Sequence, residues 1–218
     1  DIETISPKVD STRDVDFLNS RDFEVVAVGV GTRPEPGAPV DVDVLWRNHV
    51  GPEGEYELLK EVIYWLVEHH FQELLTYNGV SFDIRHLLGR AHIVGEEVGD
   101  LSLQEAMHAT LQRGRHRDLY HDIVREHGRM SLEDAVETLG GERPPSVQWD
   151  GTVVESSDIP QLAEQLLAHR DGLSDIPDDR AVQLEDTLNT YITTDIYPLF
   201  DLRDALEDGD DDSDEVTF

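Results

Sequence analysis

The chain has 218 residues and a formal net charge of −31, from 48 acidic against 17 basic residues. It contains no cysteine, which excludes disulfides and thiolate metal sites. No apolar run approaches the length of a membrane span and no basic–apolar leader opens the chain, so we expect one soluble, cytoplasmic domain without a membrane partner.

The first half of the chain has the pattern of an α/β protein. Residues 23–32 are nearly continuously apolar and rich in β-branched residues, which is typical of a central strand. Residues 40–46 alternate between apolar and polar, as in a half-buried strand, and the Pro-Gly turn at 33–37 predicts a hairpin between the two. Apolar residues at helical spacing predict an amphipathic helix over 53–70.

A second set of elements follows. Residues 74–76 form a short predicted strand that leads into Asn78, and a helix is expected from about 82 to 91. Residues 115–120 are a candidate for the fifth, short edge strand. This order predicts a mixed five-stranded sheet flanked by helices, which is the arrangement of the ribonuclease H-like α/β fold.

The rest of the chain is expected to be mainly helical. Ser131 with Asp134 forms a capping box, and the helix that it starts ends at Gly140-Gly141. Asp158 is expected to cap a helix that ends at Gly172. A last helix runs from about 179 to 206, so we expect a domain over 1–206 followed by an acidic, disordered tail over 207–218.

Acidic residues in three separate segments suggest a metal site. Asp1 and Glu3 are two residues apart, which places both side chains on one face of a strand. Tyr191 and Asp195 are four apart, which places them on one face of a helix. If Asp83 joins them, four carboxylates meet, and such a cluster requires cations. Oxygen ligands suit Mg²⁺ or Mn²⁺, and a pair of such ions is a common device for cutting phosphodiesters.

In this order, the segments Asp1-Ile2-Glu3-Thr4, Asn78-Gly79-Val80-Ser81-Phe82-Asp83 and Tyr191-Ile192-Thr193-Thr194-Asp195 resemble the motifs of the DEDD 3′–5′ exonucleases. The Tyr-x-x-x-Asp motif is similar to that of the tyrosine subtype. The segments around 77–83, 116–120 and 131–135 resemble the exonuclease domain of family B DNA polymerases. The resemblance covers most of residues 1–205, and in that family the first motif closes a central strand.

The resemblance implies a role for each motif residue. Asp1, Glu3, Asp83 and Asp195 would hold two Mg²⁺ or Mn²⁺ ions, and the hydroxyl of Tyr191 would orient the attacking water. A free tyrosine has a pKa near 10, so orientation is easier to defend than proton abstraction. Each acid taken alone would more often be an ordinary solvated residue in so acidic a chain, and only the three segments together favour a site.

Four further residues are candidates for binding substrate: Asn78, Phe82, Arg115 and Arg117. Asn78 could instead only stabilise the turn before Gly79. The two arginines belong to a basic island over 108–129, which would receive a phosphate backbone or a terminal nucleotide. The alternative, arginines paired with surplus acids nearby, stays equally open.

The acids are spread along the whole chain, and only Lys8 and Lys60 among the basic residues are lysines. This composition indicates a halophilic protein, because at about 1 M salt the Debye length falls to about 3 Å and self-repulsion is screened. An ordinary acidic protein with an acidic partner-binding role is the less favoured alternative, since no single run carries the charge.

The sequence therefore predicts a halophilic, metal-dependent 3′–5′ exonuclease that acts on single-stranded nucleic acid ends, with DNA the favoured substrate. One alternative is an RNA-trimming exoribonuclease, because no motif encodes the contact to the single hydroxyl that separates the two sugars. The other alternative is a nucleic-acid-binding module that kept the fold but is catalytically weak. Protein partners, oligomeric state and physiological pathway are not encoded in any motif.

Overall fold

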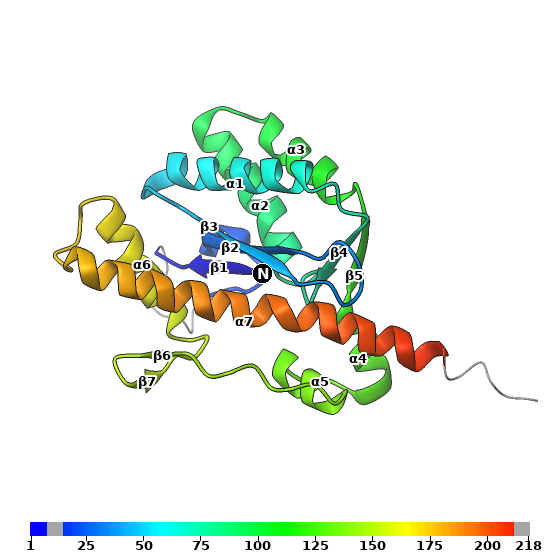
Figure 1. Cartoon of the computed structure of the whole chain (residues 1–218). Helices are drawn as coiled ribbons and strands as arrows, with labels where there is room; N and C mark the ends of the chain where they lie inside the picture. Colours follow the sequence, from blue (N-terminus) through cyan, green and yellow to red (C-terminus); the bar gives the residue numbers. More distant parts are fainter. Residues whose placement is uncertain (8–14, 212–218) are drawn as a thin grey trace, which may run out of the picture.

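The long apolar strand β2 (Glu24–Thr32) is the centre of the fold in the computed structural model, which describes residues 1–7 and 15–211, with side chains up to residue 207. It pairs antiparallel with β1 (Ile2–Ile5) along one edge and with β3 (Asp41–Trp46) along the other. The predicted hairpin between the second and third strands is confirmed. The protein has an α/β architecture (Figure 1).

In the part of the chain that the structure describes, the predicted five strands do not form one continuous hydrogen-bonded sheet. Strand β4 (Glu73–Thr76) pairs in parallel with β5 (Arg115–Asp118), and this pair is separate from β1–β2–β3. Strand β1 pairs with β2 from Ile2, which lies opposite Val28, whereas β2 continues to Thr32. A third, two-stranded ladder joins β6 (Gln148–Trp149) to β7 (Thr152–Val153).

Helices cover both faces of the central strands (Figure 1). On one face lie α1 (Gly51–Glu68), α2 (Asp83–Val98) and α3 (Ser102–Leu111), which share a core with Ile2, Val25 and Val28. On the other face α6 (Ile159–Arg170) and α7 (Asp178–Asp211) pack against Val26 and Ala27. The last third of α7 forms a further core with α4 (Leu119–His127) and α5 (Leu132–Thr138).

Small residues let α7 approach the backbone of β2. Val28 and Val30 pack in the core on the α1 side, whereas Ala27, Gly29 and Gly31 alternate with them and face α7. A Cβ atom at Gly29 would lie 2.4 Å from Cγ2 of Ile192, and one at Gly31 would lie 2.7 Å from Cγ2 of Ile196. These distances are shorter than real Cβ contacts, so the helix can take this position only because both residues are glycines.

The ends of several elements differ from those predicted. Helix α2 continues to Val98 and ends at Gly99, whose left-handed φ of 80° suits glycine. Helix α7 continues to Asp211, so the first part of the predicted tail is helical, and residues 212–218 lie outside the described part of the chain. Ser131 caps α5 as predicted, and Asp158 is the N-cap residue of α6, but its carboxylate accepts from the Glu155 N–H and makes no capping hydrogen bond to the helix.

Among the described helices, none combines the length and apolar character that crossing a membrane requires.

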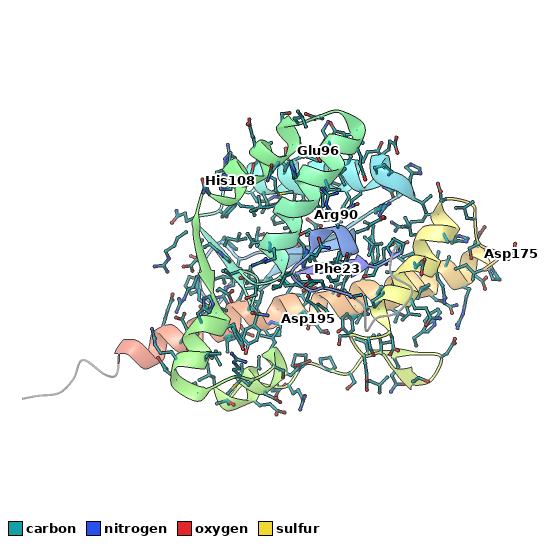
Figure 2. The ribbon with its side chains drawn as sticks, turned by 180° about the vertical axis from the view of Figure 1, so that it is seen from behind. Phe23, Arg90, Glu96, His108, Asp175 and Asp195 are labelled. Atoms are coloured by element: carbon teal, nitrogen blue, oxygen red, sulfur yellow. The ribbon has the colours of Figure 1, made fainter. Side chains whose placement is uncertain are left out.

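A buried ion pair ties α1 to α2. Glu55 accepts from Arg90 Nε at 2.8 Å and Nη2 at 2.7 Å, and its Oε1 also accepts from the Val25 N–H at 2.9 Å. Both side chains are about 1% exposed. Figure 2 places Arg90 inside the layer formed by these helices. A buried charge that loses its partner is costly, so this pair fixes how the two helices and β2 fit together.

We predict that Glu55→Gln lowers the free energy of unfolding by about 3–5 kcal/mol, because Arg90 is left as an uncompensated buried charge. The loss should be similar at low and molar KCl, since burial shields the pair from screening. The parent chain itself should become more stable as KCl rises, because screening reduces repulsion within a net charge of −31. Chemical denaturation at several KCl concentrations measures both effects.

The matched control is Arg143→Gln, which removes exposed ion pairs to Asp134 and Glu137, with the Arg143 side chain 54% exposed. Its effect should stay below about 1 kcal/mol. A loss for Glu55→Gln that is no larger than the control would contradict the proposed role of the buried pair.

Candidate active site

Strand β1 presents its two acids toward α7. Ile2 is buried in the core on the α1 side, so the alternating side chains of Asp1 and Glu3 leave the opposite face. The ladder shifts register between Glu3 and Thr4, a bulge that ends the regular pairing directly after the second acid. That Asp1 and Glu3 share a face stays a prediction from this alternation.

Asp83 joins β1 from the start of α2. Its Oδ1 accepts a hydrogen bond from the backbone N–H of Ile2 at 3.0 Å, across 81 residues of sequence. The carboxylate therefore lies at the backbone between the two acids of the first segment. Asp83 reaches this position because it is the first residue of α2, at the end of the loop that follows β4.

Helix α7 places Tyr191 and Asp195 over the same face. Three contacts fix the helix along its length: the Trp46 indole donates to Asn189 Oδ1 at 2.7 Å, Arg33 donates to Asp204 at 2.6 Å, and the two glycines of β2 admit Ile192 and Ile196. Tyr191 and Asp195 lie between the outer two of these contacts. Both are half-buried, as expected for a helix face turned toward a sheet.

The pKa values show that these groups interact. Burial, followed by the charges of Asp195 and Asp83, raises the pKa of Glu3 to about 8, although the α-amino group of Asp1 opposes the rise. Burial raises the pKa of Asp195 to about 6, helped by the charges of Glu133 and Asp83. Burial also raises the pKa of Tyr191, with further contributions from Asp195 and Glu3, so its phenol is neutral near pH 7.

The donor set suits hard divalent cations, although its members are not gathered as ligands. Within residues 1–7 and 15–211, no group of three or more Asp, Glu or His side chains has the arrangement of a metal site. However, the Oδ2 atom of Asp1 is buried without a hydrogen-bond partner among the described residues, and the buried carboxyl of Glu3 holds its proton near neutral pH. An unpaired buried oxygen and a strained carboxyl are both groups that a bound Mg²⁺ or Mn²⁺ would stabilise.

The loop that carries Asn78 is held by Asp118, a residue that the sequence analysis did not single out. The two oxygens of this buried carboxylate accept from the backbone N–H groups of Asn78 at 2.7 Å and Val80 at 3.0 Å. Asn78 itself has a φ of 61°, a conformation that asparagine tolerates well. This geometry accounts for Asn78 as a turn residue. Only the parallel pairing of β4 with β5 brings Asp118 to it, and no local pattern reveals that.

Phe82 belongs to an aromatic cluster beside Asp83. Its ring meets Phe23 edge-on at 5.6 Å and His86 at 4.5 Å. The cluster continues to Phe17, which lies 5.8 Å from Phe23 and is 62% exposed (Phe23 and Asp195 are labelled in Figure 2). His86 is buried and links Ser20 to the Phe17 carbonyl, so it fixes this segment to α2. The exposed ring of Phe17 is thus held in place by contacts with buried side chains.

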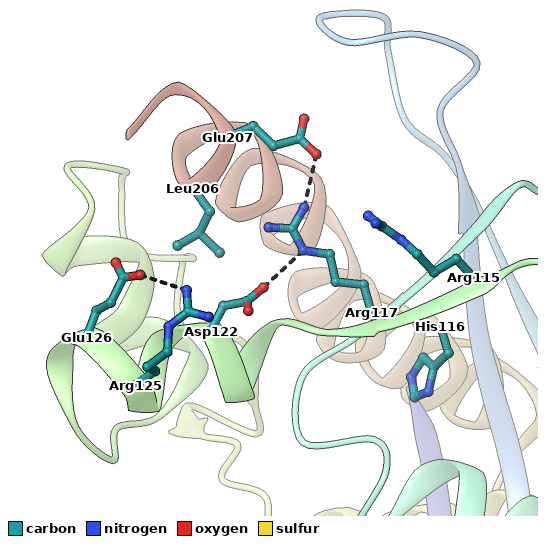
Figure 3. A pocket seen from close by; sticks show the side chains of 8 residues that line it. All are labelled: Arg115, His116, Arg117, Asp122, Arg125, Glu126, Leu206 and Glu207. Carbon is teal, nitrogen blue, oxygen red and sulfur yellow. Dashed lines mark hydrogen bonds and ion pairs between the residues drawn. The ribbon is translucent and has the colours of Figure 1, made fainter. Parts of the chain in front are cut away.

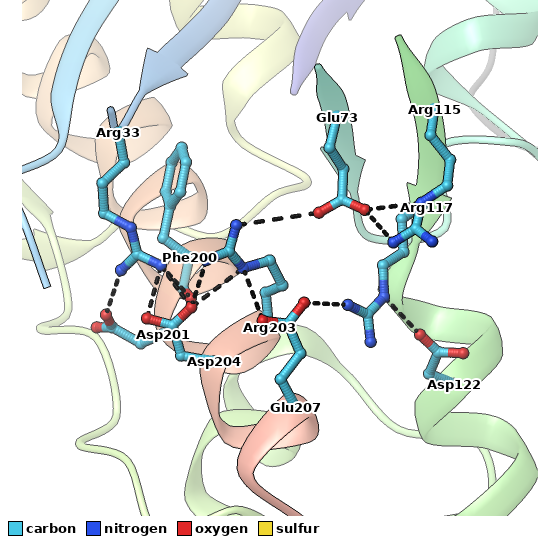
Figure 4. A network of polar contacts seen from close by, with 10 residues as sticks. All are labelled: Arg33, Glu73, Arg115, Arg117, Asp122, Phe200, Asp201, Arg203, Asp204 and Glu207. Carbon is cyan, nitrogen blue, oxygen red and sulfur yellow. Dashed lines mark hydrogen bonds and ion pairs between the residues drawn. The ribbon is translucent and has the colours of Figure 1, made fainter. Parts of the chain in front are cut away.

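The two arginines predicted to bind substrate both form ion pairs. Arg115 donates to Glu73, and Arg117 donates to Asp122 and Glu207 at 3.0 Å each. They line a surface cleft of about 460 Å³ near the carboxyl end of α7 (Figure 3) and belong to a larger network of alternating charges (Figure 4). This arrangement matches the alternative in which arginines pair with surplus acids. Their role toward nucleic acid stays a prediction.

Glu133 is a further acid near the site. Its charge raises the pKa of both Asp195 and Tyr191. The Tyr77 hydroxyl donates to the carbonyls of Met130 and Ser131, which ties the start of α5 to the end of β4. The sequence contained Glu133 within a segment that resembles the family, but only the folded packing of α5 against α7 reveals its proximity.

No protein-family model, no curated protein and no solved structure matches this chain.

We predict that the metal-free protein loses stability as pH rises from about 4.5 to about 8. The folded chain keeps the Glu3 proton up to a pKa of about 8, whereas the unfolded chain releases it near the ordinary value of 4.5. The free energy of unfolding therefore falls over this pH window and becomes constant above it. Glu3→Gln should remove the fall between pH 6 and 8, where Asp195, with a pKa of about 6, contributes little.

Chemical denaturation in molar KCl with a chelator measures this dependence. Asp186→Asn, at an exposed position earlier on α7, serves as the control and should keep the parent profile. A parent chain whose stability is constant or rises between pH 6 and 8 would show that Glu3 is not a strained, buried carboxyl.

Proposed function

We propose that the protein is a metal-dependent 3′–5′ exonuclease of ribonuclease H-like architecture that hydrolyses the terminal phosphodiester of single-stranded nucleic acid. The observation that carries the proposal is the approach of acids from three distant segments. The carboxylate of Asp83 accepts from the Ile2 N–H, and the charges of Asp83 and Asp195 both raise the pKa of Glu3. Structural acids that only solvate a surface have no reason to share one buried face.

The ligand roles follow from the chemistry of the side chains. Asp1, Glu3, Asp83 and Asp195 would hold two Mg²⁺ or Mn²⁺ ions, since all four offer hard oxygen donors. Such ions, when bound, lower the pKa of water and stabilise charge on the attacking and leaving oxygens. The protein contributes the positions of the acids, which β1, α2 and α7 supply independently.

Tyr191 is suited to orienting water rather than to removing its proton. Burial and the nearby acids raise the pKa of its phenol, so the hydroxyl keeps its hydrogen at neutral pH. A neutral hydroxyl can donate one hydrogen bond and accept others. It can therefore fix a water molecule or a phosphate oxygen next to Asp195, four residues later on the same helix face.

The surface around the site favours binding of only the terminal nucleotides over binding of a long stretch of the strand. The exposed ring of Phe17 offers a stacking surface for a base, and stacking is tolerant of sequence. Arg115 and Arg117 are already paired with acids, which leaves less positive charge for the phosphate backbone. In molar salt each phosphate contact loses value, so stacking and metal ions are the stronger means of binding a strand end.

The direct experiment is incubation of end-labelled DNA and RNA single strands of matched sequence with the protein in high KCl, with and without Mn²⁺. Mononucleotide release from the 3′ end that requires the metal supports the proposal. Release from RNA alone would identify an exoribonuclease. Binding without cleavage at saturating metal would identify the non-catalytic binding module and refute the proposed activity.

We predict that Asp195→Asn abolishes metal-dependent cleavage without unfolding the protein. The change removes one anionic ligand but keeps the size of the side chain, and in the chelated protein it also relieves the cost of a buried carboxylate. Asp186→Asn on the same helix should keep full activity. Near-normal cleavage by Asp195→Asn at saturating Mn²⁺ would remove Asp195, and with it the third motif, from the site.

We predict that Tyr191→Phe lowers kcat by about 10²–10⁴-fold, the range of a positioned proton donor or acceptor, with little change in the metal concentration that gives half-maximal rate. Tyr197→Phe is the matched control, because Tyr197 lies on the same helix and is 45% exposed. Single-turnover kinetics over a Mn²⁺ titration separates the two quantities. A parallel loss of rate and metal affinity would mean that Tyr191 supports the fold of the site instead.

A further inference from the structure

Two large apolar side chains lie next to each other at an exposed turn before β2. Phe17 is 62% exposed and Leu18 is 65% exposed. Among the exposed large apolar residues in the described part of the chain, no other two are neighbours in sequence. A single exposed apolar side chain is ordinary, whereas a contiguous pair is a candidate contact surface for a partner.

The turn is closed by its own hydrogen bonds. The Asp16 N–H donates to Asp22 Oδ2 at 2.9 Å, and the Leu18 N–H donates to Asp16 Oδ1 at 2.9 Å. The Asn19 side chain donates to Asp22 Oδ1 at 2.9 Å, and its backbone N–H donates to the Asp16 carbonyl at 2.8 Å. The position of Phe17 is therefore set by contacts on both sides of it in the chain.

One face of α2 receives the end of this turn. His86, Gly89 and Arg90 share that face, since residues three and four apart on a helix are neighbours. Arg90 Nη1 donates to the Ser20 carbonyl at 3.2 Å. A Cβ atom at Gly89 would overlap Oγ of Ser20, so the segment can lie this close to the helix only because residue 89 is glycine.

The imidazole of His86 holds the backbone of Phe17. The side chain is fully buried, and its Nε2 lies 3.2 Å from the Phe17 carbonyl oxygen. A carbonyl can only accept, so Nε2 donates this hydrogen bond, and in the neutral ring Nδ1 accepts from the Ser20 hydroxyl at 3.0 Å. Burial lowers the pKa of His86 against the opposing effect of the Phe17 hydrogen bond, so the ring is neutral near pH 7.

Aromatic rings connect this turn to the proposed metal site. Phe82 directly precedes Asp83, and its ring meets Phe23 edge-on with the centroids 5.6 Å apart. Phe23, which Figure 2 labels, lies 5.8 Å from Phe17. The three rings therefore form a row that begins beside a proposed metal ligand and ends at the exposed ring.

We propose that His86 is a positioning residue that holds Phe17, through its carbonyl, as a stacking surface for an unpaired base near the end of the strand. Leu18 adds apolar area beside the ring. The inference rests on the proposed exonuclease function and adds the part of the protein that receives a base. Asp16 and Asp22 flank the ring, so this turn repels phosphate groups, and the face of a base is the fitting partner for it.

A double-mutant cycle tests whether His86 acts through Phe17. The dissociation constant of a short labelled single strand is measured by fluorescence anisotropy in molar KCl, with Ca²⁺ in place of Mn²⁺ to prevent cleavage. Phe17→Ala should weaken binding by about 5–150-fold, the value of one stacked base. His86→Asn, which removes the Nε2 donor, should weaken it to a similar extent. The double variant should lose no more than either single variant, because both changes remove the same contact.

Further variants separate this role from general support of the fold. His86→Gln keeps an amide N–H near the position of Nε2, so it should bind the strand much like the parent chain. Gly89→Ala pushes Ser20 away from α2 without changing the imidazole, and it should weaken binding only where Phe17 is present. Leu101→Ala, at an apolar position that is 70% exposed, should leave the dissociation constant unchanged.

A strand with abasic residues in its last positions shows what the ring contacts. The parent chain should bind this strand no better than Phe17→Ala does, because no base is present to stack. A loss in Phe17→Ala that persists with the abasic strand would overturn the stacking contact. Fully additive losses in the double-mutant cycle would overturn the role of His86.

Mn²⁺-dependent cleavage by the parent chain keeps this inference apart from the proposed function. Cleavage together with an unchanged dissociation constant in Phe17→Ala would overturn the stacking surface alone. Absence of cleavage by the parent chain would refute the nuclease, even where the strand binds through Phe17. Where both proposals hold, Phe17→Ala and His86→Asn should raise KM with little change in kcat.

Discussion

The close contact between α7 and the backbone of β2 is the constraint on which the rest of the structure depends. Gly29 and Gly31 leave no side chain on the face that meets Ile192 and Ile196, so the helix lies against the strand itself. This contact sets the height of Tyr191 and Asp195 above β1. A displacement of about 1 Å at such a site can cost roughly 10²-fold in rate, so the packing is as important to the proposed chemistry as the acids.

The ionised forms of the acids at this site are electrostatically unfavourable in the metal-free protein. Burial and mutual repulsion raise the pKa of Glu3 and Asp195, and the strain must be offset elsewhere in the protein. The Glu55–Arg90 pair differs from these acids, because its opposite charges are buried but hydrogen-bonded to each other. A divalent cation would reverse the balance at the site by favouring the ionised carboxyls. If the proposed metal site is correct, metal binding would therefore stabilise the folded chain.

Much of the local structure could be predicted from the sequence, because its signals are periodic. The apolar run of β2, the turn after it and the helical spacing in α1 each predicted their element, and the spacing of Tyr191 and Asp195 placed both on one helix face. The contacts that complete the site could not be predicted in this way. Asp118 and Glu133 come near it only through the pairing of β5 and the packing of α5, which no local pattern encodes. The division of the predicted sheet into two separate sheets is likewise a property of the assembled strands, which no local pattern encodes.

The alternation of small and branched residues in β2 has a consequence for judging related sequences. Ala27, Gly29 and Gly31 are not among the proposed metal ligands, but they decide how far the helix that carries Tyr191 and Asp195 stands from the strand that follows Asp1. A homologue could retain all four acids and the tyrosine while carrying larger residues at these three positions. The residues on the helix would then be held away from the acids at the strand, and the protein would be less active than its intact motifs suggest. If the proposed function is correct, the small residues of this buried strand belong among the criteria that distinguish an active relative from an inactive one.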